Sequence, residues 1–362
     1  MSRRKDGRWV ATVTIGRDAN GRLKRRAVYG RTQRDALARL QELQSDLAAG
    51  RPVTPDRTRV SDFLERWLED AARPSIAFNT LRMYEGFVKN HIVPAVGGIT
   101  VRRLSAANVL FLQSEMERKG ASPRLRQMVH ATLRRALRDA VQWGMLARNP
   151  CDLVKRPRAA RGEASYLDAD QVRALLAAAK GDPLEALVVL AVSTGLRQGE
   201  LLGLQWGDID LQAGTLAVRR QLLEEAKGTP VLGPLKTAKS RRLVVLPEIA
   251  IASLRGHRAR LGVAQHPTAL VFTASRGGPL RKTNLLRRWY HPLVEKAGLR
   301  RIRFHDLRHT HATLLLSQGV HPKVVQERLG HASVTLTLDT YSHVTPSLQA
   351  DAAVQLDAAL GN

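Results

Sequence analysis

Two short stretches rich in proline, glycine and charge divide this chain, and they constrain its fold more than any other feature. Residues 50–55 read GRPVTP and residues 155–165 read KRPRAARGEAS. Neither stretch has apolar periodicity, which is typical of linkers. A chain of 362 residues is long enough for two or three cores. We therefore expect separate domains at residues 1–55, 58–154 and 166–362, with residues 155–165 linking the last two.

The first segment predicts a β-hairpin followed by a helix. Residues 8–15 and 22–29 alternate polar and apolar side chains, and Asn20-Gly21 between them supplies the positive φ of a tight turn. Residues 32–49 carry alanine and leucine at helical spacing. The module is basic, although a solvated surface hairpin would show the same pattern. Its candidate DNA contacts are Arg22, Lys24, Arg25 and Arg26.

The second segment reads as helical throughout. We expect helices at residues 60–70, 79–91, 105–119 and 123–143, with breaks at Arg73-Pro74, 94–98 and 120–123. Asn79 is a plausible N-cap of the second helix. A polar helix face lined with arginine can follow phosphates without reading sequence. The fourth helix supplies the candidate contacts Arg124, Arg126, Arg134, Arg135 and Arg138.

The third segment predicts a mixed domain. Asp168 and Gln171 have the spacing of a capping box that opens a helix through residue 179, and a buried helix follows at residues 183–193. Strand-like runs at residues 215–223 and 242–246 flank a connection rich in glycine and proline, and residues 348–360 form a weakly amphipathic helix. The expected fold is multidomain and mainly α with small antiparallel sheets. Its parts are a small hairpin-plus-helix module, an all-α domain and an α+β C-terminal domain.

Charge identifies the class of partner. Basic residues outnumber acidic ones by 26, and the excess is +7 in residues 1–50, +10 in residues 51–160 and +9 in the remainder. Arginine-rich codon usage contributes to this excess, but a polyanion contacted by every segment explains its even spread better than a membrane patch does. Double-stranded DNA is therefore the expected partner.

Several features argue against a membrane or secreted protein. The longest apolar run, residues 186–192, is far shorter than the ~20 residues of a membrane span. The N-terminus MSRRKDGRW lacks the apolar region of a signal peptide. Cys151 is the single cysteine, which excludes an intrachain disulfide. We expect the protein in the cytoplasm, associated with the nucleoid.

Residues 304–341 contain several side chains of the types suited to cleaving a phosphodiester. His305 and Arg308 lie three residues apart, His331 follows 23 residues later and Tyr341 ten residues after that. Histidine transfers protons near neutral pH, arginine grips phosphate with a planar fork, and a tyrosine hydroxyl can act as a nucleophile. Upstream, Arg197 offers a second positive charge for phosphate oxygens.

In these positions the chain resembles the tyrosine recombinase, or phage integrase, family. The resemblance is close over residues ~165–345 and looser upstream, where the helical and hairpin segments look like the family's core-binding and arm-binding domains. The matching stretches are TGLRQGELLGLQW, GPLKTAKSRRLVVLP, FHDLRHTHATLL, LGHAS and LDTYSH.

The resemblance implies a role for each of six residues. Tyr341 would attack the scissile phosphate, forming a 3′-phosphotyrosyl link and freeing a 5′-hydroxyl. Arg197 and Arg308 would clamp the phosphate oxygens, and Lys236, between the two strand-like runs, would protonate the leaving oxygen. The two histidines divide the remaining roles: His305 would accept the tyrosine proton and His331 would hydrogen-bond the phosphate.

It also implies the wider reaction. The enzyme would recombine specific attachment sites to integrate or excise a phage or mobile element, as a homotetramer on two duplexes, without ATP, metal or another cofactor. The C-terminal helix would dock on a neighbour in trans. A host DNA-bending protein or a directionality factor is a possible further partner.

Three other interpretations stay open at this stage. The run from His305 to His309 spells HDxxH, close to a zinc motif, with His311 nearby, but aspartate replaces the usual glutamate. A type IB topoisomerase would share the chemistry but act on one duplex. A regulator that binds DNA without cutting it is the third.

Overall fold

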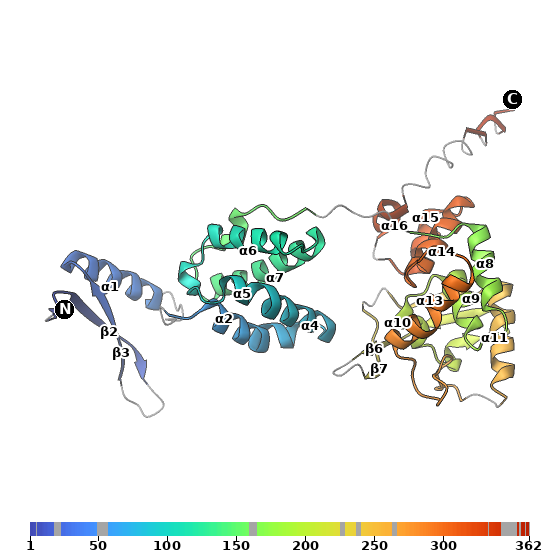
Figure 1. Ribbon diagram of the computed structural model, residues 1–362, viewed down its shortest axis with the longest axis horizontal. Coiled ribbons are helices and arrows are strands. Elements are labelled where there is room, and N and C mark those ends of the chain that lie inside the picture. Colours follow the sequence, from blue (N-terminus) through green and yellow to red (C-terminus); the bar gives the residue numbers. More distant parts are fainter. Residues whose placement is uncertain are drawn as a thin grey trace. The chain divides into compact units, whose positions relative to one another are not determined.

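The structure is a computed structural model that forms two compact units, Met1–Arg161 and Gly162–Asn362, and each is described by itself (Figure 1). It describes residues 1–4, 6–17, 23–48, 57–158, 165–224, 229–236, 240–262, 266–331 and 333–341, with parts of 353–361.

The N-terminal module is a three-stranded antiparallel sheet with one helix against it (Figure 1). Its elements are β1 (Ser2–Arg3), β2 (Trp9–Arg17), β3 (Leu23–Gly30) and α1 (Gln33–Ala48). The strand order is β1-β2-β3, and α1 contacts both long strands. The predicted hairpin and helix are confirmed. The predicted turn, with Arg22, lies outside the described residues.

The rest of the first unit is helical. Its elements are α2 (Val60–Trp67), a π turn (Leu68–Ala72), α3 (Arg73–Ser75), α4 (Phe78–Phe87), a π turn (Val88–Ile92), α5 (Val93–Val96), a 3-10 turn (Val101–Arg103), α6 (Ala106–Arg118), α7 (Pro123–Gln142) and a 3-10 turn (Pro150–Leu153). The side chain of Trp67 is fully buried, and its indole N–H donates to Asp139 at 2.7 Å. The helices expected at 105–119 and 123–143 are confirmed.

Two predicted helix boundaries in this unit are wrong. The helix continues past Pro74 to Ser75, and the next one passes Pro94 before it ends at Val96. A π turn lies immediately before each short proline-containing helix. Proline lacks an N–H to donate and crowds the preceding turn, and a widened turn absorbs both effects without ending the helix. Asn79 is not an N-cap, because α4 already begins at Phe78.

Among its described residues, the second unit contains helices and two small antiparallel sheets. Its elements are α8 (Ala169–Ala179), α9 (Glu185–Thr194), α10 (Gln198–Leu202), a 3-10 turn (Trp206–Asp208), β4 (Ile209–Asp210), β5 (Thr215–Val218), β6 (Gln221–Glu224), β7 (Pro230–Gly233), β8 (Arg242–Val245), α11 (Glu248–Arg260), α12 (Lys282–Leu285), a π turn (Leu286–Tyr290), α13 (His291–Lys296), α14 (Asp306–Ser317), α15 (Pro322–Leu329) and α16 (Val334–Tyr341).

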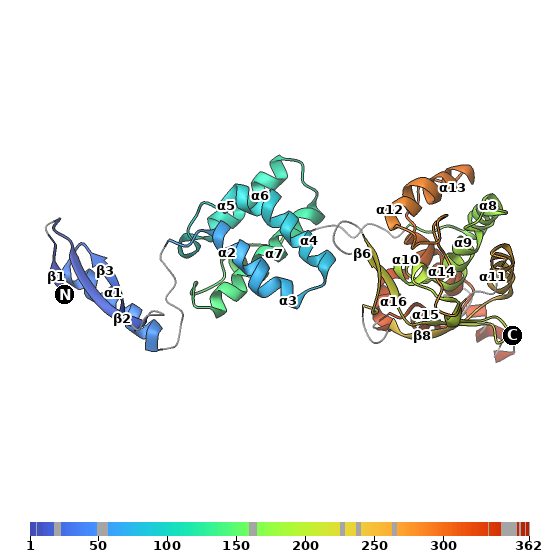
Figure 2. The same ribbon diagram turned by 90° about the horizontal axis from the view of Figure 1, so that it is seen from below.

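Helix α9 lies at the centre of this unit. It contacts α8, α11 and α14, which surround it in Figure 2. Its residues from Ala186 to Val192 are all buried, as expected of a helix that is apolar on every side. Asp168 caps α8 by accepting from the backbone N–H of Gln171 at 2.8 Å, so the predicted capping box is confirmed.

The sheets differ from the expectation in how the strands divide and pair. Strands β4, β5 and β8 form one antiparallel sheet, in which Thr215 lies opposite Val245. The run predicted as one strand at 215–223 is two strands, and β6 leaves the sheet to pair with β7. Strand β7 has no strand pattern in its sequence, because Pro230 and Gly233 mark its ends. Proline is tolerated there because a two-stranded hairpin has free edges.

The predicted C-terminal helix is only partly within the described residues. Residues 353–354, 356–358 and 360 are helical, and 348–352 lie outside the description. The side chains of Val354, Leu356 and Leu360 are exposed.

Candidate active site

The site begins at the tight turn that ends α9. Gly195 terminates this helix with φ +64°, and an added Cβ would lie 2.7 Å from both the His311 ring and the Leu329 side chain. Only glycine fits here, because a side chain would be strained and would clash. The turn leads directly to Arg197 at the start of α10. It also leaves the carbonyl of residue 195 facing α14.

Arg308 lies on α14 with only 3% of its surface exposed. Its Nη1 donates to the carbonyl of Gly195 at 2.8 Å, and its Nη2 donates to the carbonyl of Leu329 at 2.7 Å. The planar fork thus ties the end of α9 to the end of α15. A buried guanidinium held in this way keeps a fixed position and its full positive charge.

The C-terminus of α15 receives two further arginines. Arg242 Nε donates to the carbonyl of Arg328 at 2.6 Å, and Arg197 Nη2 donates to the carbonyl of Gly330 at 3.4 Å. With Arg308 on Leu329, three consecutive carbonyls, 328 to 330, accept from three guanidiniums. The last carbonyls of a helix lack intrahelical donors and carry partial negative charge, so cations are favourable there. Positively charged side chains from α10, β8 and α14 therefore lie together at this helix end.

Glu200 joins two of these arginines. Its Oε1 lies 2.8 Å from Arg197 Nη1, and its Oε2 lies 2.9 Å from Arg242 Nη2. Only 2% of the glutamate side chain is exposed. Burial favours the neutral acid, but the charges and hydrogen bonds of Arg242 and Arg197 outweigh it and lower the pKa of Glu200. The carboxylate is therefore ionised.

His331 follows directly after these carbonyls. Gly330 ends α15 with φ +65°, and the imidazole Nδ1 of His331 lies 2.9 Å from the hydroxyl of Thr337 on α16. Burial, followed by the charges of Arg308 and Arg197, lowers the pKa of His331 to about 3. The ring is neutral at pH 7, so one nitrogen donates and the other accepts.

His305 and His309 lie together at the start of α14. Their ring centroids are 5.2 Å apart and their planes are nearly perpendicular. Desolvation, then the neighbouring His309 and Arg308, lowers the pKa of His305 to about 4. His311 lies on the buried side instead, where its Nδ1 is 2.8 Å from the Val192 carbonyl. Among the described residues, no three His, Cys, Asp or Glu side chains gather as a metal site would require.

Lys236 and Tyr341 are the two remaining predicted site residues. Lys236 is exposed on the connection between β7 and β8, and residues 237–239 lie outside the described part of the chain. Tyr341 is the last residue of α16, ten residues after His331. Its side chain lies outside the description.

The predicted arginines of α7 do not share one environment. Arg124, Arg134 and Arg138 are exposed, and Arg135 lies over the Tyr84 ring at 5.8 Å. Arg126 instead pairs with Glu117 of α6 at 2.9 Å, with 16% of its side chain exposed. In the N-terminal module Arg25 is exposed on β3. The side chains of Lys24 and Arg26 are outside the description.

Sequence reasoning missed Arg242 and Glu200. Glu200 lies three residues after Arg197, on the first turn of α10, which is the spacing of an ion pair. Arg242 begins a strand whose other residues are apolar, and this position could have drawn attention to it. Neither signal shows that the two side chains meet, because 42 residues separate them.

Two family models match separate parts of this chain. The model of the phage integrase family matches residues 165–347, and that of the phage integrase N-terminal SAM-like domain matches residues 59–116. The chain belongs to the phage integrase family. This integrase is 31% identical over 371 residues to a tyrosine recombinase XerC-like protein of Caldanaerobacter subterraneus subsp. tengcongensis, covering 96% of this chain and 95% of that protein.

Solved structures share the fold of this integrase. The Tn1549 transposon integrase in complex with a circular intermediate DNA superposes with a TM-score of 0.71 at 21% identity, covering 82% of this chain and 99% of that one. A lambda integrase tetramer bound to a Holliday junction gives a TM-score of 0.60 at 22% identity, covering 93% of each chain. The predicted fold class is confirmed. The integrase is a tyrosine-type site-specific recombinase that acts on DNA.

No helix in the described part of the chain has both the length and the apolar character needed to cross a membrane.

Proposed function

We propose that the hydroxyl of Tyr341 attacks the scissile phosphate beside the C-terminus of α15. The new bond joins the tyrosine oxygen to phosphorus at the 3′ side, and the bond to the 5′ oxygen breaks. The observation that carries this proposal is the set of three arginines on carbonyls 328 to 330, immediately before His331. A largely buried cluster of cations of this kind suits a phosphate whose negative charge grows during the reaction.

Arg197 and Arg308 act on the phosphate oxygens in different ways. Arg197 has 34% of its side chain exposed, so it can meet a phosphate with its fork. Arg308 is buried and held by two carbonyls, so it contributes a fixed charge behind the site. Both act without reorganising in the transition state, which is where fixed charges accelerate a reaction most.

The two histidines act in their neutral forms. If the Thr337 hydroxyl donates to Nδ1 of His331, then Nε2 carries the proton and donates it as a hydrogen bond to phosphate. His305 accepts the proton that Tyr341 loses, because its lowered pKa keeps the ring unprotonated before the reaction. Lys236 gives a proton to the 5′ oxygen as it leaves. The exposed position of this lysine is consistent with contact to DNA.

The upstream segments bind DNA without cutting it. Residues 58–154 grip the duplex beside the cleavage point through the exposed side of α7, with Arg124, Arg134 and Arg138 near phosphates. Residues 1–55 bind a second class of site through the basic hairpin, which includes Arg22, Lys24, Arg25 and Arg26. Arg126 is better explained as a structural partner of Glu117.

The active assembly is a homotetramer on two attachment sites, and it integrates or excises a phage or another mobile element. The C-terminal helix docks on a neighbouring subunit, and a host bending protein or a directionality factor assists. The energy of the broken bond stays in the phosphotyrosine, so strand exchange needs neither ATP nor a metal. The enzyme works in the cytoplasm, on the nucleoid. The lambda integrase tetramer on a Holliday junction, which shares the fold, supports this arrangement.

A Tyr341→Phe variant tests the chemistry. We expect it to bind DNA as the wild type does and to form no covalent adduct on a nicked suicide substrate, because it lacks the attacking oxygen. Tyr166→Phe is a matched control, since Tyr166 is an exposed tyrosine of the same unit outside the site. A denaturant-resistant protein–DNA band from the Tyr341 variant would refute the proposal.

A further inference from the structure

We propose that Arg242 is a positioning residue that offsets the charge of Glu200, so that the carboxylate does not cancel the positive charge that Arg197 presents to the scissile phosphate. This inference rests on the proposed role of Arg197. It also gives the buried glutamate a function in the site.

Arg242 is the more enclosed of the two arginines that pair with Glu200. It opens β8, and only 7% of its side chain is exposed. Its guanidinium donates to Glu200 at 2.9 Å, to the Arg328 carbonyl at 2.6 Å and to the Ser240 carbonyl at 3.0 Å. These partners come from α10, α15 and the connection just before β8, so the guanidinium cannot turn toward DNA without breaking all three contacts.

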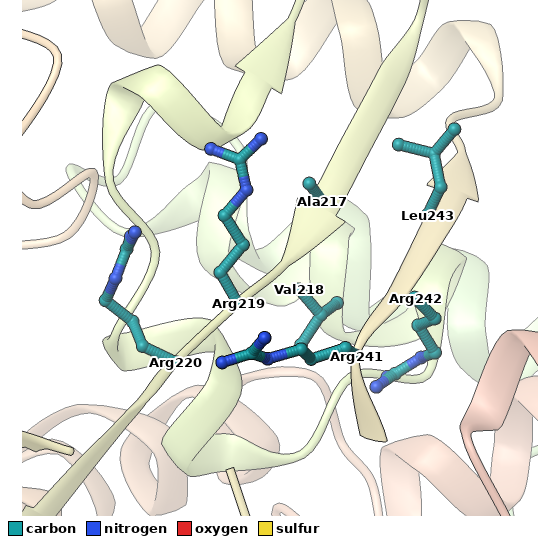
Figure 3. Close-up of a pocket in the computed structure, with 7 residues that line it drawn as sticks. All are labelled: Ala217, Val218, Arg219, Arg220, Arg241, Arg242 and Leu243. Atoms are coloured by element: carbon teal, nitrogen blue, oxygen red, sulfur yellow. The ribbon is translucent and has the colours of Figure 1, made fainter. Parts of the chain in front are cut away.

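The neighbouring arginines serve as a comparison. A hollow of about 500 Å³ is lined by four arginines around the ends of β5 and β8 (Figure 3). Within it Arg219 and Arg220 both pair with Asp208, which is 2% exposed. Arg241 is exposed and has no ion pair in the described part of the chain. Its side chain leaves the strand in a different direction from that of Arg242 (Figure 3).

The charges determine what Arg242 does. Two guanidiniums share one carboxylate, and the group of three carries a net charge of +1. The buried Arg242 satisfies Oε2 of Glu200, while the partly exposed Arg197 bonds Oε1 and can still face a ligand. If Arg242 were neutral, Glu200 and Arg197 would form a pair of net charge zero. Such a pair attracts a phosphate only weakly, because its carboxylate repels the same oxygens.

A purely structural role for Arg242 makes a different prediction. In that case its loss would act through the released carbonyls of Arg328 and Ser240, which a second change at Glu200 would not restore. Under charge compensation, replacing Glu200 by glutamine in the same protein returns the net charge to +1 and frees Arg197. The double variant therefore separates the two roles.

The experiment measures the single-turnover rate of adduct formation on a suicide substrate, at saturating DNA. The full-length variants are Arg242→Met, Arg242→Lys, Glu200→Gln and the double variant Glu200→Gln/Arg242→Met. We expect Arg242→Met to slow adduct formation on the order of 10- to 100-fold. Arg242→Lys should keep most of the rate because it keeps the charge. The double variant should be at least several-fold faster than Arg242→Met.

Two further variants make the result decisive. Arg241→Met removes an adjacent exposed arginine and should leave the rate unchanged. Arg197→Ala tests the proposed function itself: a wild-type rate in that variant would overturn the phosphate clamp rather than the role of Arg242. Thermal unfolding checks that each variant folds, and if Arg242→Met does not, the same comparison is made between the neutral variants Arg242→Gln and Glu200→Gln/Arg242→Gln. A double variant as slow as its Arg242 parent, or a wild-type rate in that parent, would overturn the inference.

Discussion

The turn at Gly195 offers the sharpest test of how the site is built. In a Gly195→Ala variant the new methyl would lie 2.7 Å from His311 and Leu329, at φ +64°. The left-handed conformation costs alanine about 1–2 kcal/mol. Displacing two packed side chains costs about 1–3 kcal/mol more. We therefore expect the free energy of opening around α9 and α14 to fall by about 2–5 kcal/mol.

Gly319→Ala is the matched control. Gly319 has φ +75° and nothing within 4 Å of an added Cβ, so it incurs only the conformational cost. Hydrogen–deuterium exchange of peptides from α9 and α14 measures both variants in the full-length protein. Because the carbonyl of residue 195 holds Arg308, the rate of adduct formation should fall only in Gly195→Ala. Equal losses of stability in the two variants would refute the reasoning.

Three other predictions concern charge and burial. Burial, then the charge of Arg328, lowers the pKa of His311 to about 3 in the folded protein. Between about pH 6.5 and 3 the unfolded state therefore binds one more proton than the folded state does. Stability should therefore fall on acidification by about 1.4 kcal/mol per pH unit for this group, and His311→Gln should have a shallower dependence in urea unfolding. Arg126→Ala should lower the midpoint of thermal unfolding, and Arg138→Ala should leave that midpoint unchanged. Arg138→Ala should instead reduce the number of ions released on DNA binding, read from the salt dependence of the binding constant, by about one. Arg308→Lys should abolish measurable adduct formation with DNA binding retained, since lysine cannot reach both carbonyls; a wild-type rate would contradict the clamp.

The sequence predicted features that depend on local pattern. The capping box at Asp168 and the hairpin of β2 and β3 follow from spacing within a few residues. The buried helix α9 follows from an uninterrupted apolar run. In each case the residues that make the structure are neighbours in the chain, so their pattern carries the information.

The missed features depend on contacts between distant segments. The helices pass Pro74 and Pro94 because a π turn absorbs the missing hydrogen bond, and packing of the helical core decides whether that turn forms. Arg242 looks like a surface cation until the fold places Glu200 against it. The three arginines that donate to the last carbonyls of α15 likewise come from α10, β8 and α14, which are far apart in the sequence.

The central claim is that Tyr341 becomes linked to DNA beside this cluster of arginines. The most direct measurement traps the adduct on a suicide substrate and maps it by mass spectrometry of the digested protein. The account predicts a nucleotide attached through its 3′ phosphate to the peptide containing Tyr341, with a free 5′-hydroxyl on the released strand. An adduct on another residue, or one joined through a 5′ phosphate, would contradict it.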